Sequence, residues 1–521
     1  MTLCENSKGI ENSELPDDNR TRDEIAKIKE ICNLERNKGK KIVVVQGLGF
    51  VGSVMAAVVA DCEEEGKSPY FVVGVDLPSI DSFWKIPSIN SGKSPFKAED
   101  PEVDKIFERT VKSKANLIAT WVPEAYSEAD IIVVDINLDA VKPVVGKAED
   151  GYVDTANFEK AIREIGRRMR QYALILIETT VPPGTTEYIV KPIIEECFRE
   201  RCIELSGDYP LIAHSYERVM PGAKYIQSIR KFWRTYSGCN EEAARKTRAF
   251  LSNVIDTRDH PLFEMKKPAA SELAKIMENS YRAMNIAFIH EWTLFAEDIG
   301  INLFNVVDSI RVRKGTHDNM MYPGFGVGGY CLTKDPILAE WASHKLFGRK
   351  EHLRFSIEAV NVNDLMPHHT FDLLMKAMDN NIAGKKIVIL GASYREDVDD
   401  TRNSPSIILY DDIRSTGGIP AIHDPYATTM MQREDICIES DLSLALEDAN
   451  AVVFVVRHNE YKKLSINLLE AKINKGACII DAFNVLNDEK MIRLKRDGFG
   501  VVGVGKGHIT KFLGPREDKI C

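Results

Sequence analysis

Residues 41–52 read Lys-Ile-Val-Val-Val-Gln-Gly-Leu-Gly-Phe-Val-Gly, a short apolar run followed by three glycines in the spacing Gly-x-Gly-x-x-Gly. The run 41–46 predicts a buried strand, and the apolar stretch 53–62 predicts a helix after the glycines. A second apolar run, 70–75, ends in Asp76, 24 residues beyond Gly52. A strand, a glycine turn, a helix, a strand and an acid in this order predict a dinucleotide-binding Rossmann unit.

Each part of this motif has a physical reason. Gly47 would make the tight turn, Gly49 would admit a pyrophosphate, and Gly52 would let helix and strand pack closely. Asp76 would accept hydrogen bonds from both ribose hydroxyls and repel a 2′-phosphate, which favours NAD over NADP. The alternative is a glycine-rich turn that binds no ligand. The cofactor-binding candidates here are Gly47, Leu48, Gly49, Phe50, Val51, Gly52 and Asp76.

Apolar runs at 130–135 and 173–177, with a helical pattern at 157–171 between them, predict that the unit is a doubly wound parallel sheet. Side chains just past the carboxyl ends of such strands face the cofactor crevice, so Thr180 is a candidate for cofactor contact and catalysis. Thr185 and Thr186 are better explained as caps of a helix over 187–197. Glu217, in the next polar loop, is a candidate general base, although a lone glutamate is more often only solvated.

Apolar residues at helical spacing over 269–299 predict one long helix. Lys275 and Asn279 stand four residues apart, so both side chains leave the same face. Because the helix is broadly apolar around them, we expect the pair to be held in a site. A helix of this length between two α/β blocks also suits packing against its copy, so we expect a homodimer or a higher homo-oligomer.

The segment 323–336 reads Pro-Gly-Phe-Gly-Val-Gly-Gly-Tyr-Cys-Leu-Thr-Lys-Asp-Pro, with four glycines before its cysteine. These glycines predict a bent loop whose N–H groups face a ligand. We expect a helix to open near Leu332, which would stabilise the thiolate of Cys331 and place Asp335 one turn beyond it. The alternative is a glycine-rich turn with an inert cysteine.

A second α/β block follows, with strands expected at 385–391, 450–457, 477–481 and 501–503. Arg395 and Arg402 lie between its first strand and a helix, where they would bind phosphate or form an exposed ion-pair loop. The predicted fold class is therefore α/β, with two Rossmann-like doubly wound parallel-sheet domains joined by a central long-helix domain. The predicted boundaries are an extension over 1–40 and domains over 41–258, 259–372 and 373–521.

The composition, 44% hydrophobic and 28% charged in 521 residues, is that of an ordinary globular protein. A net charge of −10 argues against binding to nucleic acid or to an anionic membrane. No apolar run suits a membrane span, and the polar start predicts disorder over 1–20 and a peripheral helix over 21–36. Ten scattered cysteines without metal-ligand spacing predict reduced cytoplasmic thiols and no metal site.

Six motifs, taken in order, resemble those of the UDP-glucose/GDP-mannose dehydrogenase family, the nucleotide-sugar 6-dehydrogenases. They are the glycine motif with Asp76, Thr179-Thr-Val-Pro-Pro-Gly184, Glu217, Lys275 with Asn279, Gly326-Val-Gly-Gly-Tyr-Cys331-Leu-Thr-Lys-Asp335, and Tyr394-Arg-Glu-Asp-Val-Asp-Asp-Thr-Arg402-Asn-Ser-Pro405. The resemblance implies that Cys331 is the nucleophile and that Lys275 and Asn279 hold the oxyanion. It also implies that Asp335 and Thr180 position water, that Glu217 is an acid/base, and that Arg395 lies at the phosphates of a UDP-sugar.

Within this family the loop around the glutamate sorts substrates. The segment 215–222, Ser-Tyr-Glu-Arg-Val-Met-Pro-Gly, resembles that of members acting on UDP-N-acetylhexosamines. We therefore expect UDP-N-acetylglucosamine or UDP-N-acetylmannosamine as substrate, in polysaccharide biosynthesis, with UDP-glucose or GDP-mannose as the alternative. The substrate-contact candidates are Glu217, Arg218, Val219, Lys275, Asn279, Gly328, Arg395 and Arg402. The chain departs from the family in three places: Asp135-Ile-Asn137 replaces a Pro-Thr-Pro type turn, Tyr330 a histidine, and Phe483 an arginine.

The implied chemistry explains why a dehydrogenase needs a cysteine. Converting a C6 alcohol to a carboxylate removes four electrons, so two NAD molecules are reduced in turn. A thiolate at Cys331 would hold the intermediate aldehyde as a thiohemiacetal, and the next oxidation would give a thioester that water hydrolyses. Two rival interpretations are a two-electron β-hydroxyacid-type dehydrogenase and a non-catalytic nucleotide-binding protein.

Overall fold

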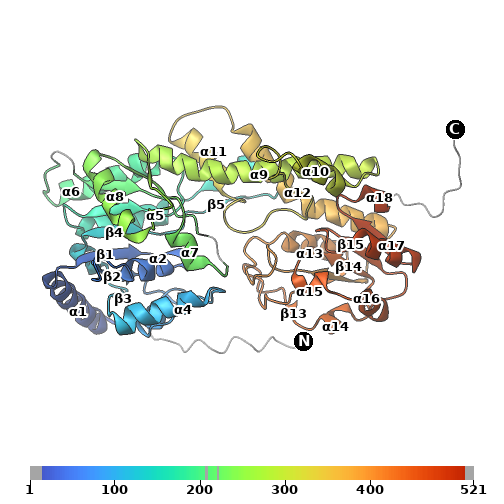
Figure 1. The fold of residues 1–521 in the computed structure, drawn as a ribbon, viewed down its shortest axis with the longest axis horizontal. Coiled ribbons are helices and arrows are strands. Elements are labelled where there is room, and N and C mark those ends of the chain that lie inside the picture. The colour runs from blue at the N-terminus through green and yellow to red at the C-terminus, as the bar shows by residue number, and fades with distance from the viewer. Residues whose placement is uncertain (1–14, 206–208, 220–221, 511–521) are drawn as a thin grey trace. The chain divides into compact units, whose positions relative to one another are not determined.

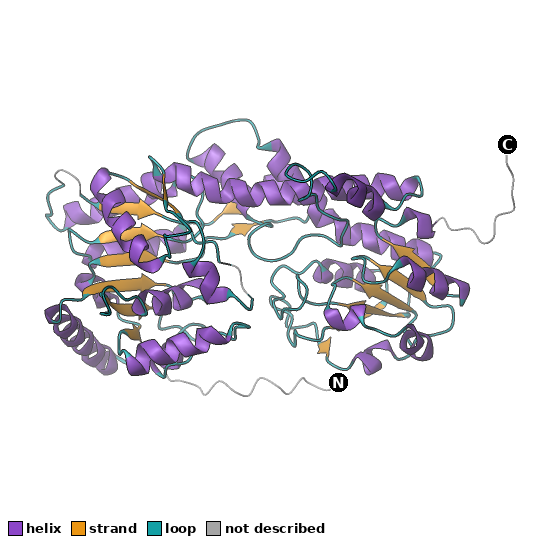
Figure 2. Ribbon diagram, viewed as in Figure 1, coloured by secondary structure: helices purple, strands orange, loops and turns teal. Residues whose placement is uncertain are grey.

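The computed structural model describes residues 15–205, 209–219 and 222–510. The chain divides into two compact units. Unit 1 comprises residues 1–141, 152–276 and 341–350, and unit 2 comprises residues 142–151, 277–340 and 351–521. In each unit a layer of strands lies between helices (Figures 1 and 2). The predicted fold class, α/β with two parallel-sheet domains and a long helix between them in the sequence, is confirmed.

The sheet of unit 1 has eight strands in the order β10-β9-β8-β7-β4-β1-β2-β3. All neighbours pair in parallel except β8 with β9. The chain passes from β1 outward to β2 and β3, then returns to β4 on the other side, which makes the edge between β1 and β4 a topological switch point. The strands are β1 (Lys41–Gln46), β2 (Tyr70–Val75), β3 (Leu117–Thr120), β4 (Ile131–Val134), β7 (Leu174–Ile177), β8 (Leu211–His214), β9 (Thr235–Gly238) and β10 (Phe263–Glu264); β5 (Ala140–Val141) and β6 (Tyr152–Val153) form a separate pair.

The apolar stretch after the glycine turn forms a buried helix in unit 1. Every residue from Gly52 to Ala60 in α2 (Phe50–Ala60) is buried. Helix α1 begins at Asp18, so the expectation of disorder over 1–20 is wrong for 18–20. Residues 1–14 lie outside the described residues. The α-helices are α1 (Asp18–Asn37), α2, α3 (Lys85–Asn90), α4 (Pro101–Glu108), α5 (Ala156–Arg168), α6 (Lys191–Glu200), α7 (Tyr225–Arg230) and α8 (Glu241–Val254). Short π-helices are η1 (Arg109–Ser113) and η4 (Thr186–Val190), and η2 (Pro123–Glu128) is a 3₁₀-helix.

The predicted long helix is α9 (Pro268–Asp298), whose residues to 276 belong to unit 1 and whose remainder belongs to unit 2. The six-stranded sheet of unit 2, in the order β13-β12-β11-β14-β15-β16, is parallel throughout. Its strands are β11 (Lys386–Leu390), β12 (Ile419–His423), β13 (Ile438–Glu439), β14 (Ala451–Phe454), β15 (Cys478–Asp481) and β16 (Gly500–Gly503). The other elements are η3 (Ala148–Asp150), α10 (Leu303–Arg311), α11 (Asp335–Lys345), α12 (Arg354–Ala377), α13 (Ser406–Ser415), α14 (Leu442–Leu446), α15 (Asn459–Lys462), α16 (Ile466–Lys472), α17 (Asp488–Arg496) and α18 (Gly507–Thr510).

No helix in the described part of the chain is long and apolar enough to cross a membrane. The three domain boundaries expected from the sequence, after residues 40, 258 and 372, remain a prediction.

Candidate active site

The glycine turn between β1 and α2 is shaped for close approach. Gly47 has a φ of +92°, and a Cβ on it would lie 2.4 Å from the carbonyl oxygen of Asp135. A Cβ on Gly52 would lie 2.0 Å from the carbonyl oxygen of Gly47. Gly49 has open space at its Cβ position and is the N-cap residue of α2, so it leaves the first N–H groups of that helix to a ligand. This cradle fits the pyrophosphate of NAD.

Asp76, at the end of β2, is fixed by three donors. Its Oδ2 accepts from Leu48 N at 3.1 Å and from Lys85 Nζ at 3.0 Å, and its Oδ1 accepts from Leu77 N at 2.8 Å. Lys85 is a cofactor-site candidate that the sequence analysis missed; its only signal is its place nine residues after the acid. Leu48 is fully buried, so only its backbone can serve a ligand, whereas Phe50 stacks on Tyr225 at 5.2 Å.

Two acids that follow the neighbouring strands β4 and β7 were given no role in the site by the sequence analysis. Glu178 follows β7 with no exposed surface, and its Oε1 accepts from Arg234 Nη1 at 2.7 Å. Asp135 follows β4, and its Oδ2 would lie 3.0 Å from a Cβ on Gly52. Burial raises the pKa of both carboxyls, and the neighbouring carboxylate charges raise the pKa of each further. The departure from the family at Asp135 therefore places a group that resists ionisation under the cofactor turn.

The segment after β7 is anchored to the start of α9 by Glu272. This buried carboxylate accepts from Gly184 N at 2.6 Å, from Thr186 N at 2.8 Å and from Thr186 Oγ1 at 2.6 Å. Burial outweighs these bonds and raises the pKa of Glu272 to about 7. Thr185 is the N-cap residue of η4, which continues directly into α6, so the expected helix start is correct. The expected capping by the side chain is wrong, because Thr185 Oγ1 donates to the carbonyl oxygen of Pro182 instead.

The loop after β8 meets α9 within unit 1. Lys275, 9% exposed, donates from Nζ to the carbonyl oxygen of Glu217 at 3.2 Å, so two predicted catalytic residues come together. The Glu217 carboxylate accepts from Val219 N, and Arg218 Nη2 donates to the hydroxyl of Tyr216 at 3.0 Å. Met220 and Pro221 lie outside the described residues.

Thr180, the remaining unit 1 candidate, is partly exposed beside buried Thr179. Its position just past the end of β7 suits the crevice at the switch point, and its role in catalysis and cofactor binding stays a prediction.

Cys331 lies on an exposed loop in unit 2. The loop is bent by Gly326 and Gly329, whose φ angles are +133° and +80°. The expectation that α11 opens near Leu332 is wrong, because the helix begins at Asp335. The carbonyl oxygen of Cys331 accepts from Asp335 N at 2.9 Å, so the cysteine stands one turn ahead of the helix.

Asp335 forms hydrogen bonds with two other predicted catalytic residues of unit 2, Asn279 and Cys331. Its side chain is fully buried, and its Oδ2 accepts from Asn279 Nδ2 at 2.6 Å. Its Oδ1 accepts from Lys334 Nζ at 2.8 Å, a residue that sequence reasoning quoted without giving it a role. Cys331, Asn279 and Asp335 therefore form one local assembly in which the backbone of the cysteine and the side chain of the asparagine both bond the same aspartate.

The glycines of this loop pack against protein rather than facing a ligand. A Cβ on Gly328 would lie 2.6 Å from Cβ of Tyr394, and one on Gly329 would lie 2.8 Å from the Tyr394 ring. Gly329 N donates to the carbonyl oxygen of Arg402 at 2.9 Å. The expectation of ligand-facing N–H groups is therefore wrong for Gly329, and substrate contact by Gly328 stays a prediction.

The two candidate phosphate-binding arginines differ in environment. Arg402 pairs with Asp400, with 2.5 Å between Nη2 and Oδ2, whereas the side chain of Arg395 is exposed. The ion-pair alternative thus describes Arg402, and phosphate binding by either arginine stays a prediction.

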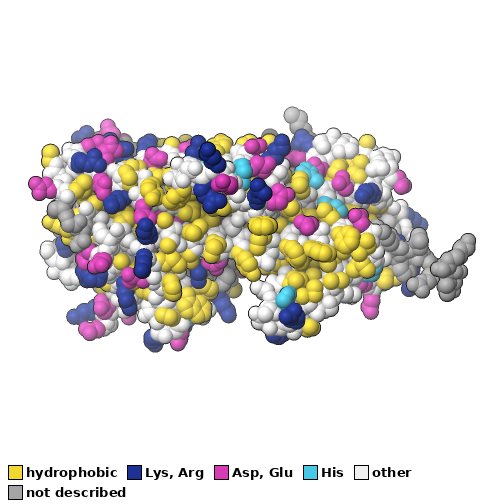
Figure 3. Space-filling view, turned by 90° about the horizontal axis from the view of Figure 1, so that it is seen from above, with side chains coloured by type: hydrophobic (Ala, Val, Ile, Leu, Met, Phe, Trp, Pro, Cys, Tyr) yellow, Lys and Arg dark blue, Asp and Glu magenta, His cyan; other side chains and the backbone are white. Residues whose placement is uncertain are grey.

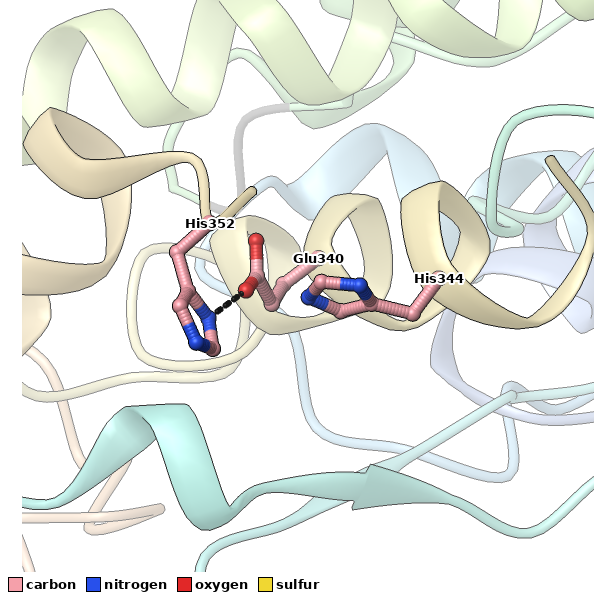
Figure 4. A group of neighbouring side chains, drawn as sticks. All are labelled: Glu340, His344 and His352. Carbon is pink, nitrogen blue, oxygen red and sulfur yellow. Dashed lines mark hydrogen bonds and ion pairs between the residues drawn. The ribbon is translucent and has the colours of Figure 1, made fainter. Parts of the chain in front are cut away.

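One group of His and Glu side chains in the described residues has the size for a metal ion: Glu340, His344 and His352 (Figure 4). Hydrogen bonds account for these side chains. The carboxylate of Glu340 accepts a hydrogen bond from His352 Nδ1 and another from the backbone N–H of Leu353, with 2.8 Å between N and O. Leu353 is the N-cap residue of α12. His344 Nδ1 lies 2.6 Å from the carbonyl oxygen of Arg349. These bonds hold the ends of the connection between α11 and α12, and the expectation of no metal stays a prediction.

Comparison with known proteins identifies the family. Three domain models of the UDP-glucose/GDP-mannose dehydrogenase family match this chain. The NAD-binding domain matches residues 40–252, the central domain matches residues 269–364, and the UDP-binding domain matches residues 388–488. A UDP-N-acetyl-D-mannosamine dehydrogenase of Pyrococcus horikoshii is 29% identical over 90% of this chain and all of its own length. One from Methanococcus vannielii is 28% identical over 91% of this chain and 99% of its own.

A solved structure from Methanosarcina mazei, described as an NDP-N-acetyl-D-galactosaminuronic acid dehydrogenase, superposes with a TM-score of 0.75 at 28% identity, covering 93% of this chain and 98% of its own. Domain models, relatives and solved structure agree over most of the chain. The chain belongs to the UDP-glucose/GDP-mannose dehydrogenase family and carries that family's NAD-binding domain.

Proposed function

We propose that this enzyme oxidises the C6 alcohol of a UDP-N-acetylhexosamine to the carboxylic acid, with Cys331 holding the half-oxidised sugar. The observation that supports the proposal is the assembly of Cys331, Asn279 and Asp335. A two-electron dehydrogenase forms no covalent intermediate, so its chemistry does not require an exposed thiol one helical turn from a buried carboxylate that accepts two side-chain hydrogen bonds. A non-catalytic binding protein has no use for it either.

Each residue has a role in this chemistry. Residues 47–52 and Asp76 would hold NAD, and two NAD molecules bound there in turn would supply the hydride acceptors for the two oxidations at C6. Between them, the thiolate of Cys331 adds to the aldehyde carbon, a C–S bond forms, and the carbonyl oxygen gains the charge. Lys275 and Asn279, one turn apart on α9, supply donors for that oxygen.

Hydrolysis then releases the product. Water attacks the thioester carbon, Asp335 takes the proton of the water, and the C–S bond breaks to return Cys331 as a thiolate. Thr180 helps to orient this water, and Glu217 exchanges the proton of the C6 hydroxyl.

The choice of substrate rests on the loop after β8 and on the relatives. The loop Ser215–Gly222 resembles that of members acting on acetylated amino sugars, and two similar curated proteins are named for UDP-N-acetyl-D-mannosamine. The solved structure from Methanosarcina mazei is named for a galacto-configured acetylated sugar. The shared feature is the N-acetyl group, which we take to be the recognised chemistry.

A panel of sugar nucleotides tests this choice. With NAD in excess, we expect kcat/KM for UDP-N-acetylmannosamine, UDP-N-acetylglucosamine or UDP-N-acetylgalactosamine to exceed that for UDP-glucose and GDP-mannose by about a hundredfold or more. The expected cause is a site whose polar groups hydrogen-bond the acetamido group of the sugar. A sugar with a hydroxyl at that position would leave those polar groups without a partner. Preference for UDP-glucose or GDP-mannose would contradict the substrate, and no turnover of any sugar would contradict the catalytic role.

The family's UDP-binding domain supports a UDP-sugar as the small-molecule partner.

An apolar surface of unit 2 supports association of this chain with a second copy of itself. The exposed face of α9 carries Met277, Tyr281, Phe288, Trp292 and Phe295, exposed Ile299 follows the helix directly, and Phe355 of α12 is 81% exposed. Phe288 and Phe355 also line a groove of about 450 Å³ between these helices. Figure 3 views this side of α9 and shows apolar side chains gathered there. Monomeric proteins rarely leave so continuous an apolar face exposed, so we infer a homodimer through α9 and α12.

Sedimentation of the full chain tests this pairing. The wild type should have the mass of two chains, and the double variant Phe288→Glu/Phe355→Glu should have the mass of one. Leu444→Glu, which charges an exposed leucine on α14, is the matched control and should remain paired. A single-chain wild type, or a double variant that stays paired, would refute the interface.

We place the enzyme in the cytoplasm. None of the eight cysteines within the described residues forms a disulfide, as expected in a reducing compartment, and the nucleophile itself requires a reduced thiol.

A further inference from the structure

Helix α1 (Asp18–Asn37) precedes the part of the chain that the NAD-binding family model matches, which begins at residue 40. It is nevertheless a packed part of unit 1. Its side chains at Glu24, Ile28, Cys32 and Glu35 form one buried face, and Ile28 and Cys32 have no exposed surface. Because one face of α1 is buried, the elements of unit 1 against which that face packs indicate what the helix stabilises (Figure 1).

The neighbour of the first half of α1 is the carboxyl end of β3. Thr120 Oγ1, fully buried, donates to Glu24 Oε1 at 3.0 Å. One residue later, Trp121 Nε1 donates to Thr21 Oγ1 at 3.3 Å. Because the carboxyl ends of parallel strands form the cofactor edge of the sheet, these two bonds fix the backbone at that edge.

Thr120 and Trp121 in turn hold the segment that begins with Asp76. The carbonyl oxygen of Thr120 accepts from Asp76 N at 3.2 Å. The Trp121 ring packs edge-on against Phe83, with centroids 5.4 Å apart, and Phe83 lies between Asp76 and Lys85. Asp76 is therefore linked to α1 through Thr120, and the segment between Asp76 and Lys85 is linked to α1 through Trp121 and Phe83.

We propose that α1 is a positioning element for the adenosine end of the NAD site, acting through Thr120 and Trp121 on Asp76 and the segment after it. The proposal needs only the NAD-binding domain and is independent of the sugar. It predicts that damage to this contact weakens binding of the adenosine half of the cofactor and leaves the chemistry at Cys331 intact.

Titration calorimetry of the full chain with ADP-ribose, which lacks nicotinamide, measures that half alone. Glu24→Ala should weaken ADP-ribose and NAD by about tenfold, because the lost hydrogen bond releases Thr120. At saturating NAD, kcat and the KM for the sugar nucleotide should stay at wild-type values. Glu24→Gln keeps an acceptor oxygen and should restore most of the affinity.

Arg36→Ala is the matched control, because Arg36 ties the other end of α1 to the carbonyl oxygen of Glu128 at 2.6 Å. It should lower the melting temperature and leave ADP-ribose binding unchanged. Thr21→Val removes only the contact to Trp121 and serves if Glu24→Ala does not fold; it should weaken ADP-ribose by a few-fold. Wild-type ADP-ribose affinity in the folded Glu24 or Thr21 variant, or an equal loss in Arg36→Ala, would overturn the proposal.

Discussion

Replacing Cys331 by serine is expected to stop formation of the sugar acid, with kcat for the complete reaction falling by at least about a thousandfold. An alcohol ionises far less readily than a thiol, so capture of the aldehyde slows, and any ester that forms is a poorer substrate for water than a thioester. Intact-mass measurement after incubation with NAD and the sugar nucleotide should reveal an ester-linked sugar on the introduced serine. Product analysis should find no acid above background.

The matched control is Cys437→Ser, which makes the same atomic change at another exposed cysteine of unit 2. It should retain the wild-type rate. Steady NADH formation by Cys331→Ser at the wild-type rate and yield would refute the covalent step.

Replacing Asp335 by asparagine is expected to slow hydrolysis and lower kcat by about a hundred- to a thousandfold, while both oxidations still occur. The amide cannot take a proton from water, so the thioester should accumulate. Rapid mixing should then show a burst of NADH, and the quenched enzyme should carry the sugar on Cys331. Asp497→Asn, a change at an exposed acid, should behave as wild type.

Stability must be measured beside this rate. The substitution leaves Lys334 buried without its charged partner, a loss that costs about 3–5 kcal/mol in comparable pairs. Thermal unfolding of the variant identifies the temperature at which it remains folded, and the rates are compared there. A folded variant that shows the same small NADH rate from the first turnover, with no adduct, would contradict the assignment of Asp335 to hydrolysis.

The parts that the sequence predicted well depend on neighbours in the chain. The strand over 41–46, the glycine turn and the helix after it follow from local apolar pattern and backbone freedom, and the structure places β1 at Lys41–Gln46. The long helix is correct to one residue at each end, Pro268–Asp298 against 269–299. The i, i+4 spacing also put Lys275 and Asn279 on one face without any knowledge of the fold.

The failures involve partners that are distant in sequence. Gly328 and Gly329 are small because Tyr394 packs on them, and the hydroxyl of Thr186 donates to distant Glu272 instead of capping the helix that begins there. Nothing in a local window shows that Arg234 will bury its charge against Glu178. The late start of α11 is a local failure: residues 332–334 form a turn in which Lys334 N and Asp335 N both donate to the carbonyl oxygen of Cys331, and the helix begins at Asp335.

The direct test of the account is the number of NADH molecules formed for each sugar consumed by the wild-type enzyme. Absorbance gives NADH, and chromatography of the nucleotide sugars gives the remaining substrate, the acid and any aldehyde. If Cys331 retains the half-oxidised sugar, the ratio is two from the first turnovers onward, and no aldehyde appears in solution. A ratio of one, or aldehyde released before acid, would contradict the account.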